Sequence, residues 1–551
     1  MTPATDPTTL ERLADDYWTA WLERHPVHAT ALGDRRFDNR LDDDSPEGRE
    51  AWRGQLDRFE RSLGDASATH DPVTHAALGE ALITDRAFLD ADLGTFNVDP
   101  MDGVQVGLLN IPSYQPIRSD EEAEALVERW RRIPGYVDQA AENLRRGAAE
   151  GRIGVAMLCA KVSQQLDELL GRPDAEWPLA QPAHERPEIR DALLAVIGQG
   201  IRPAFERYRA LIADEISPRA RPDDRPGLTH VAGGADAYAR LARAHTSLDV
   251  APDEVHAIGL EEVRRIDAEF VELGGRLLGT AGLAATLAAL RSDPALHFRT
   301  GDEIVAVAEA SLARANAAIG DWFGRLPQAP CEVVVMAPHE EKHSTIAYYR
   351  EPAGDGSRPG QYHINTYAPE TRPRYEAETL AFHESVPGHH LQIAIAQELD
   401  HLPAFRRFSG STAYIEGWGL YTERLSEEMG LLSGELDRFG ILSFDAWRAS
   451  RLVVDTGIHA LGWTRQAAID FMTQHTALGE NNVANEVDRY IAYPGQALAY
   501  KLGQLELLRL RAEARDRQGG RFEIRRFHDV VLGESALPLP VLRRVVEHAL
   551  V

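Results

Sequence analysis

The feature that most constrains this chain is a helical pattern of apolar residues that is interrupted once by a short β-rich segment. Up to about residue 325, apolar residues recur three and four positions apart, and acids crowd the first turns of each segment. At Cys331 the pattern changes to short runs of β-branched and aromatic residues, and from Arg374 the helical pattern returns. The sequence therefore predicts a mostly α fold with a small sheet of about three strands. We expect a helical amino-terminal half over residues 1–325, and a catalytic half with the sheet over residues 326–551.

Three segments give sharper expectations. Ser119 and Gly151 are a typical N-cap and stop for one helix, and Pro252 is placed to open another. The proline- and glycine-rich residues 216–236 predict a long surface loop. Residues 277–290 form the longest uncharged apolar run, but these 14 residues are too few to cross a membrane. We expect them to form a buried helix.

Charge and cysteine content exclude several classes of protein. The 551 residues include 86 Asp or Glu and 59 Lys or Arg, which gives a formal net charge of −27. This acidic excess argues against binding to nucleic acid or to an anionic membrane surface. Cys159 and Cys331 lie far apart and predict neither a disulfide framework nor a thiolate metal site. The amino terminus lacks the basic and apolar regions of a secretory signal, which predicts a cytoplasmic protein.

Residues 339–343 spell HEEKH, a literal match to the HExxH zinc motif. The segment lies between two predicted strands and has no apolar periodicity that would bury a helix against a core. With 20 histidines in an acid-rich chain, one chance match is unsurprising. We therefore expect a solvated loop here rather than a metal site.

A second candidate is the segment AETLAFHESVPGHHLQ, in which His383 and Glu384 follow a predicted helix face. On an unbroken helix, His390 would lie about 10.5 Å along the axis from His383, too far for both to bind one zinc ion. Pro387 cannot continue the helix, because it lacks an N–H and clashes with the preceding turn. A break there would bring His389 to the position of the second ligand, with His390 as the alternative. A helix end whose histidines merely complement the dipole is the other interpretation.

The third ligand is expected on the helix AYIEGWGLYTERL, where Glu416 and Glu423 stand among aromatic and aliphatic residues. Acids on an apolar helix face need a partner. Glu416 is the better candidate for the third zinc ligand. Glu423 would instead accept a hydrogen bond from the other ring nitrogen of a ligand histidine. The alternative is that both acids are paired with Arg424 or another arginine.

These segments, together with PGQALAYKLG, resemble the bacterial family known as domain of unknown function 885, whose members are treated as zinc metallopeptidases. The resemblance extends to LERHPVHATALGDRRFDNRLDD near the start of the chain and to GSRPGQYHINTYAP. More distantly, the segment is similar to thimet oligopeptidase and carboxypeptidase Taq, which are helical zinc peptidases. The resemblance implies a zincin-like helical metallopeptidase. This chain departs from HExxH by two extra residues between Glu384 and His389.

The expected chemistry is hydrolysis with one zinc ion per chain. We expect His383, His389 and Glu416 to hold the zinc, and Glu384 to take a proton from the attacking water. The favoured function is a metallopeptidase for short peptides, because helical halves around a small sheet would form a deep cleft. A zinc hydrolase of another amide or ester and a metal-free helical binding protein are the alternatives.

Further residues are candidates for substrate contacts. A developing oxyanion needs a hydrogen-bond donor besides the metal. The candidate donors are Tyr493, Tyr500 and His459. The strand GQYHINTY would suit backbone pairing with an extended peptide, so His363 and Asn365 are candidate substrate-binding residues. The sequence leaves open whether the chain forms a homodimer.

Overall fold

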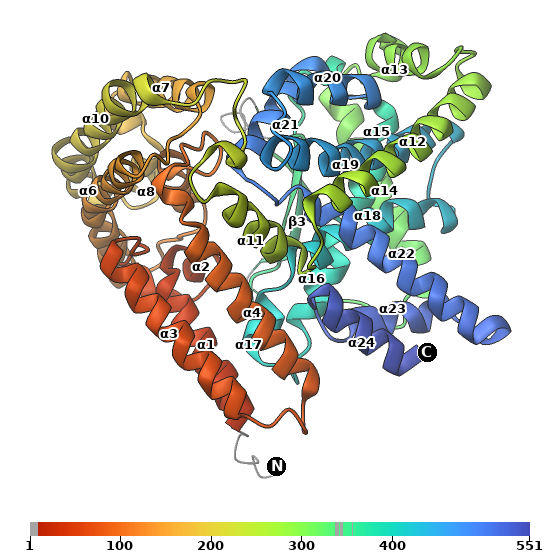
Figure 1. The fold of residues 1–551 in the computed structure, drawn as a ribbon, viewed down its shortest axis with the longest axis horizontal. Coiled ribbons are helices and arrows are strands. Elements are labelled where there is room, and N and C mark those ends of the chain that lie inside the picture. Colours follow the sequence, from red (N-terminus) through yellow and green to blue (C-terminus); the bar gives the residue numbers. More distant parts are fainter. Residues whose placement is uncertain (1–8, 337–340, 342–344, 355, 357, 551) are drawn as a thin grey trace.

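The fold is mostly helical and contains a three-stranded sheet, as the sequence predicts. Figure 1 shows the amino-terminal helices on the left, the carboxy-terminal helices on the right, and strand β3 near the centre. Of the literal HExxH segment, Glu341 alone falls within the described residues, so the predicted loop over residues 339–343 lies outside them. The computed structural model describes residues 9–336, 341, 345–354, 356 and 358–550.

The helices before the sheet form three groups along the chain. The first group is α1 (Thr9–Arg24), α2 (Pro26–Ala31), α3 (Pro46–Asp65) and α4 (Pro72–Ala91). The second is α5 (Val104–Asn110), α6 (Asp120–Ala149), α7 (Ala156–Leu170), α8 (Pro182–Glu185), α9 (Arg190–Val196) and α10 (Arg202–Leu211). The third is α11 (Gly234–Thr246), α12 (Pro252–Leu277), α13 (Leu283–Ser292) and α14 (Gly301–Ala318).

After the sheet the chain is helical again from Arg374, as predicted. These helices are α15 (Arg374–Glu384), α16 (His389–Gln397), α17 (Ala404–Phe408), α18 (Thr412–Glu428), α19 (Arg438–His459), α20 (Arg465–His475), α21 (Glu480–Ala492), α22 (Leu498–Gln518), α23 (Ile524–Leu532) and α24 (Leu539–Leu550). Within the described part of the chain, no helix combines the length and the apolar character that crossing a membrane requires.

Two of the predicted helices begin where their capping residues indicate. The Ser119 side chain accepts a hydrogen bond from the backbone N–H of Glu122 at the start of α6. Helix α12 begins at Pro252, whose missing N–H is not needed in the first turn. The predicted loop over residues 216–236 is irregular, with short 3-10 turns, until α11 begins.

The single buried helix predicted over residues 277–290 is wrong. The chain leaves α12 at Leu277 and does not enter α13 until Leu283. Between them, Gly279 and Gly282 adopt positive φ angles of 65° and 89°. Such angles are favourable for glycine and end a helix, and apolar periodicity does not report them.

The sheet consists of β1 (Cys331–Val335), β2 (Ala347–Arg350) and β3 (Gly360–Ile364) in the order β1-β3-β2. The central strand β3 runs parallel to β1 and antiparallel to β2. Both edges of β3 are therefore already paired within the protein. The prediction that a peptide substrate would pair with this strand is wrong, because strand order depends on tertiary contacts that one strand's sequence does not contain.

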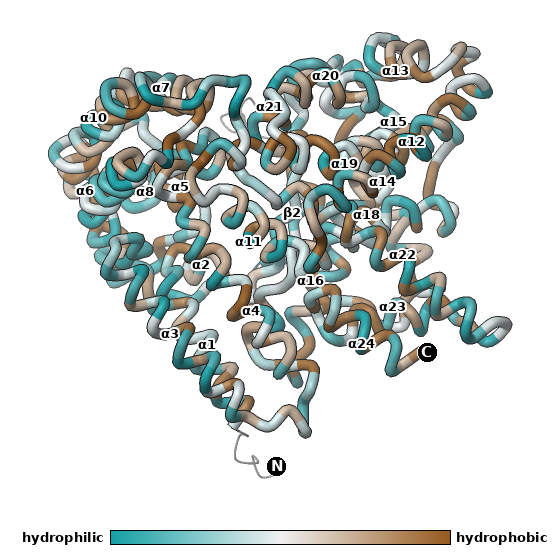
Figure 2. Tube along the Cα trace, in the orientation of Figure 1, coloured by the Kyte–Doolittle hydropathy of each residue, from teal (hydrophilic) through white to brown (hydrophobic). Residues whose placement is uncertain are grey.

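The largest hydrophobic core crosses the boundary predicted at residue 325. The largest core extends from Leu10 in α1 to Leu550 in α24 and includes residues of α16 and α18. A second core is built from residues 98–216 and is local in sequence. In Figure 2, hydrophobic segments gather along central helices such as α19, whereas hydrophilic ones prevail on the outer helix α3. The two predicted halves therefore share a core around the candidate site.

Candidate metal centre

Three side chains from separate helices converge on one point. His383 lies near the end of α15, His389 opens α16, and Glu416 belongs to α18. One potential ligand atom of each lies within 4.8 Å of those of the other two. Both histidines are buried. The three residues predicted from the sequence as metal ligands are thus brought together.

The helix break predicted at Pro387 is confirmed and explains how the histidines meet. Helix α15 ends at Glu384, and α16 begins five residues later. Within the break, a Cβ atom on Gly388 would lie 1.9 Å from the carbonyl oxygen of His383, so only glycine fits there. The ring centroids of His383 and His389 are 4.6 Å apart. The two residues added relative to HExxH are thus accommodated in the connection between helices.

His383 is oriented by a buried carboxylate. Its Nδ1 atom lies 2.8 Å from Oε1 of Glu423, the contact predicted for that acid, so the alternative of an arginine pair does not describe it. When Nδ1 donates to this carboxylate, the lone pair on Nε2 is left for a metal ion. Burial lowers the pKa of His383 well below its usual range, which keeps the imidazole neutral. Burial also raises the pKa of Glu423 to about 8.

His389 and Glu416 form a buried pair of their own. Nε2 of His389 lies 3.6 Å from Oε2 of Glu416. Burial by itself disfavours both charges, but the mutual attraction outweighs it, so the pKa of His389 is raised and that of Glu416 is lowered. Two ligands of a tetrahedral zinc ion lie about 3.4 Å apart. The pair is therefore spaced much as two ligands of one ion would be.

Glu384 stands beside the cluster at the end of α15. Burial raises the pKa of its carboxyl group, and the backbone N–H of Tyr349 in β2 donates a hydrogen bond to it. The charges of His389 and Glu416 act on the same group in opposite directions. Glu384 therefore lies where the sequence placed the general base, between the cluster and the edge strand of the sheet.

His390, the predicted alternative ligand, is not available to a metal ion. Its Nδ1 atom lies 2.9 Å from the hydroxyl of Tyr349, and its Nε2 atom lies 3.0 Å from the carbonyl oxygen of Ala329. Because Nε2 donates to the carbonyl, Nδ1 accepts from the tyrosine. A Cβ on Gly360 would lie 2.4 Å from Nδ1, so the ring is also tightly enclosed. The alternative role is wrong because both nitrogens are engaged.

His459 is likewise a structural residue, and its predicted catalytic role is wrong. The backbone N–H of Leu228 donates to Nδ1 at 3.2 Å, and Nε2 donates to the carbonyl oxygen of Tyr490 at 2.9 Å. Burial lowers the pKa of the ring to about 4. The neutral ring therefore joins two backbone segments and has no nitrogen left for a substrate.

The two candidate tyrosines have different surroundings. The hydroxyl of Tyr500 accepts hydrogen bonds from Arg489 and Gln496 at 3.5 Å each. The charge of Arg489 also lowers the pKa of Glu416, so Tyr500 lies on that side of the cluster. Tyr493 packs edge-on against His245 with ring centroids 5.2 Å apart. Burial raises the pKa of Tyr493 to about 12.

Of the two predicted substrate-binding residues, Asn365 serves the protein itself. The Asn365 amide donates to the carbonyl oxygens of Glu341 and Thr345 at 2.6 and 3.0 Å. Its oxygen accepts from the backbone N–H of Tyr367 at 3.0 Å. The predicted role of Asn365 is therefore wrong, because the side chain fastens a loop. His363 stacks on Tyr348 across the strand pair, with ring centroids 4.5 Å apart, and its contact with a substrate stays a prediction.

Two glycines of α18 make room for the site, and sequence reasoning missed both. A Cβ on Gly419 would lie 2.6 Å from Cε1 of His383, within the space of the ring. A Cβ on Gly417 would lie 2.4 Å from the carbonyl carbon of Gly503 in α22. Two glycines two positions apart in a helix, as in EGWG, were the signal that could have indicated this close packing.

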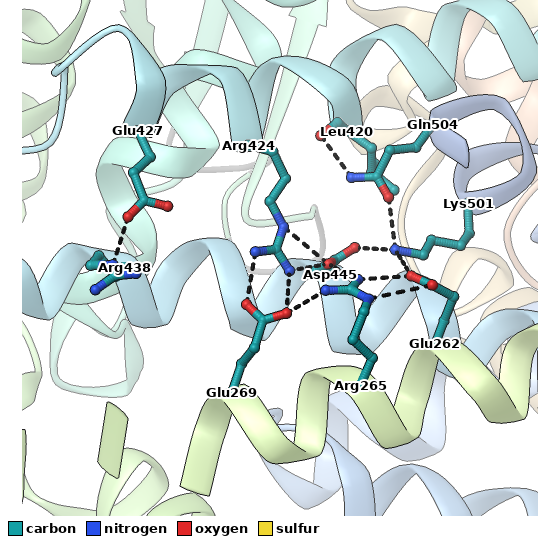
Figure 3. A network of polar contacts seen from close by, with 10 residues as sticks. All are labelled: Glu262, Arg265, Glu269, Leu420, Arg424, Glu427, Arg438, Asp445, Lys501 and Gln504. Atoms are coloured by element: carbon teal, nitrogen blue, oxygen red, sulfur yellow. Dashed lines mark hydrogen bonds and ion pairs between the residues drawn. The ribbon is translucent and has the colours of Figure 1, made fainter. Parts of the chain in front are cut away.

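An ion-pair network centred on Asp445 joins the helices behind the site (Figure 3). The Asp445 carboxylate contacts Lys501 of α22 and Arg424 of α18 at 2.5 Å each, and Arg265 of α12 at 3.1 Å. Burial would raise the pKa of Asp445, but these three charges outweigh it and hold the pKa far below its usual range. Because α18 also carries Glu416, the network fixes the helix that supplies the third candidate ligand.

Two cavities of the described residues lie away from the cluster. One lies between α1, α3, α4 and α17, and the other between the end of α2 and the segment after β2. None of the three cluster residues lines either cavity. The deep cleft expected around the site stays a prediction.

The comparison with protein families gives a clear result. The family described as "Bacterial protein of unknown function (DUF885)" matches residues 26–546. The chain belongs to this family. The resemblance noted in the sequence is thereby confirmed, whereas kinship with zinc peptidases stays a prediction, since the family's function is unknown.

Two solved structures share the fold of this DUF885 protein over nearly its whole length. A candidate lipoprotein from Colwellia psychrerythraea has a TM-score of 0.92 at 26% identity, covering 98% of this chain and 99% of that one. A candidate lipoprotein of unknown function from Shewanella oneidensis has a TM-score of 0.76 at 15% identity, covering 98% and 100%. The second likeness bears on the fold alone. Among curated proteins, none matches the chain.

Proposed function

We propose that this protein is a zinc-dependent hydrolase, and specifically a metallopeptidase that cleaves short peptides. The observation that carries the proposal is the cluster of His383, His389 and Glu416, whose ligand atoms lie within 4.8 Å of one another. Two imidazoles and one carboxylate are the ligand set of many catalytic zinc sites, which keep a fourth position open. Structural zinc sites are instead closed by four protein ligands.

The chemistry of the surrounding residues fits a zinc ion. His383 is neutral, and Glu423 accepts from its other nitrogen, which is the arrangement that directs a histidine towards zinc. The 3.6 Å between His389 and Glu416 is close to the separation of two zinc ligands. One ion per chain follows from the single cluster found among the described residues.

Different residues of this chain would carry out the separate steps of hydrolysis. A bound zinc ion would polarise the substrate carbonyl and lower the pKa of water to about 7. Glu384 would act as the base that accepts a proton from the attacking water and returns it to the leaving group, and burial raises the pKa of its carboxyl group, which makes it a better proton acceptor. Tyr500 is the favoured oxyanion donor, because it accepts from Arg489 and so directs its own proton elsewhere. Tyr493 is the second candidate donor.

Only the sequence resemblance favours a peptide substrate over another amide or an ester. The same residues would support hydrolysis of any of these substrates. Hydrolysis of a peptide mixture, followed by mass spectrometry, separates these two possibilities. Cytoplasmic location stays a prediction, and the lipoprotein names of the two structural relatives do not support it. A homodimer also stays open.

Equilibrium dialysis against zinc, followed by metal analysis, tests the proposal. We expect one tightly bound zinc ion per chain, which His383→Ala and Glu416→Ala should lose. His390→Gln is the matched control, because it changes a neighbouring buried histidine whose nitrogens are both engaged. Glu384→Gln should keep the zinc and lose hydrolysis. A wild-type protein that binds no zinc would support the metal-free binding protein instead.

A further inference from the structure

Helix α19 is almost entirely buried, yet it carries a line of polar residues at helical spacing. A polar group inside a protein is costly unless it finds a partner. Each polar side chain of the line is therefore expected to have a hydrogen-bond or ion-pair partner. The members are Asp445, Arg448, Arg451, Asp455 and His459.

Four members of this line have partners within the chain. Asp445 is held by the network of Figure 3, and the ring of His459 by two backbone groups. Nε of Arg451 donates to the hydroxyl of Tyr490 at 3.0 Å, and Nη2 donates to Glu486 at 2.9 Å. The Asp455 carboxylate accepts from a tyrosine hydroxyl at 2.6 Å.

Arg448 is the least satisfied member. It is 5% exposed, and its Nε and Nη1 atoms are both buried without a hydrogen-bond partner among the described residues, whereas Arg451 lacks a partner at Nη1 alone. The guanidinium carbon lies 4.2 Å from the ring centroid of Trp447 and 4.7 Å from that of Phe444. Because the aromatic rings hold the flat group by its faces, the donors along its edge remain for another group. A buried charge left in this way is expected to meet a ligand.

The unpaired charge lies next to the candidate metal centre. Helix α19 packs against both α15 and α18. The charge of Arg448 acts on His383, Glu384 and His389, the residues of the cluster and its base. Arg448 is therefore placed to contact a substrate group that lies close to the bond that is cleaved.

Two further arginines lie near Arg448, and both have an acidic partner. Arg451 stacks on the same Trp447 ring, with its guanidinium carbon 4.6 Å from the centroid. Arg451 and Arg489 share one carboxylate, that of Glu486, at 2.9 and 3.5 Å. Arg448 has no such partner: its charge acts on Glu376, Glu384 and Glu423, but its Nε and Nη1 atoms form no hydrogen bond with any of them. A carboxylate ligand would supply the missing acceptor, because the edge of a guanidinium matches the two oxygens of a carboxylate.

We propose that Arg448 binds a carboxylate of the substrate and thereby selects peptides that carry a carboxylate close to the bond that is cleaved. The inference rests on the proposed function and adds a substrate class to it. Two sources supply this chemistry, the free carboxyl end of a peptide and an Asp or Glu side chain. Because Arg448 lies at a fixed distance from the metal cluster, the cleaved bond would lie at a fixed distance from the bound carboxylate.

The test uses three mixtures of short peptides: free acids without acidic side chains, the same peptides as carboxyl-terminal amides, and amides that contain Glu. The zinc-loaded full-length protein should deplete one of the carboxylate-bearing mixtures at least 30-fold faster than the plain amides. Arg448→Gln should reduce that preference to less than threefold, and Arg448→Lys should restore part of it. A merely structural role would slow all three mixtures alike. Arg276→Gln, which removes a surface arginine paired with Glu435, is the control.

Binding is measured separately, so that the inference and the proposed function fail in different ways. In dialysis against zinc-loaded Glu384→Gln protein, the preferred carboxylate-bearing peptides should be retained over the plain amides, and Arg448→Gln should abolish this enrichment. If peptides are cleaved without any preference for a carboxylate, the inference is overturned and the proposed function stands. If nothing is cleaved but the enrichment depends on Arg448, the function is overturned and carboxylate binding stands. If Arg448→Gln keeps the preference, Arg448 is not the anchor.

Discussion

Gly419→Ala is the substitution that most directly tests how the candidate metal centre is built. The added methyl group would lie 2.6 Å from Cε1, 2.9 Å from Nδ1 and 3.0 Å from Nε2 of His383. Ordinary contact begins at 3.4 Å, so the imidazole would have to move by about 0.8 Å. Glu423 holds the ring on its other side, which leaves it little freedom to move without losing that hydrogen bond.

Gly419→Ala should weaken metal binding at a small net cost to folding. Zinc–ligand distances tolerate about 0.2 Å, so a shift of this size should lower zinc affinity by at least about 10-fold, equivalent to about 1.4 kcal/mol. Overpacking a buried site costs about 1–3 kcal/mol of folding free energy. Replacing glycine by alanine inside a helix returns about 1 kcal/mol. The folded protein should therefore survive with a weakened metal site.

Competition with a chelator measures the zinc affinity, and urea unfolding of the metal-free protein measures the fold. The matched control is Gly54→Ala in α3, where a Cβ would meet nothing within 4 Å. The control should leave zinc affinity unchanged and raise the unfolding free energy by up to about 1 kcal/mol. A Gly419→Ala protein that binds zinc as tightly as the wild type would refute the argument that His383 is the ligand enclosed by this glycine.

Three further predictions concern the ion-pair network at Asp445, the structural residue His459 and the binding of zinc. Asp445→Asn should cost up to about 3 kcal/mol at pH 7, because Lys501, Arg424 and Arg265 lose their shared buried acid and keep only Glu262 and Glu269. The pKa of Asp445 is lower in the folded than in the unfolded protein, so its contribution to the free energy of unfolding is present above the unfolded pKa of about 3.9 and is lost as the pH falls below it. The difference in unfolding free energy between the variant and the wild type, measured by urea unfolding, should therefore become smaller in acid. His459→Ala should cost about 1–3 kcal/mol for each backbone group it leaves unpaired but should not change zinc content; loss of zinc would contradict the structural role. Zinc at 100 times its dissociation constant should stabilise the wild type by about 2.7 kcal/mol in thermal unfolding, and should not stabilise Glu416→Ala if that residue is a ligand.

Local signals in the sequence predicted the parts of the fold that depend on local physics. Ser119 and Pro252 marked helix starts because capping and the missing proline N–H act within one turn. Pro387 indicated a break that the structure contains, and Glu423 was placed beside a histidine because an acid on an apolar face needs a partner. The turn at Gly279 was missed because hydrophobicity alone does not report a backbone angle.

Features that depend on distant segments could not be predicted. His389 and His459 are both buried histidines on helices, and only contacts from residues far along the chain decide which is engaged by backbone groups. The central place of β3 in the sheet is set by strand packing rather than by its own residues. The isolation of Arg448 emerges only once the partners of its neighbours on α19 are known.

The shared core has a consequence for how the chain folds during synthesis. Residues 98–216 form a core that is local in sequence, so this part can collapse while the ribosome is still translating. The core around the candidate site instead joins Leu10 to Leu550. Helices α1 to α4 can pack on one another early, but the faces of α1 and α4 that contact α17 and α24 stay uncovered until those later helices have been made. We expect nascent chains of this protein to depend on chaperones that shield their first helices.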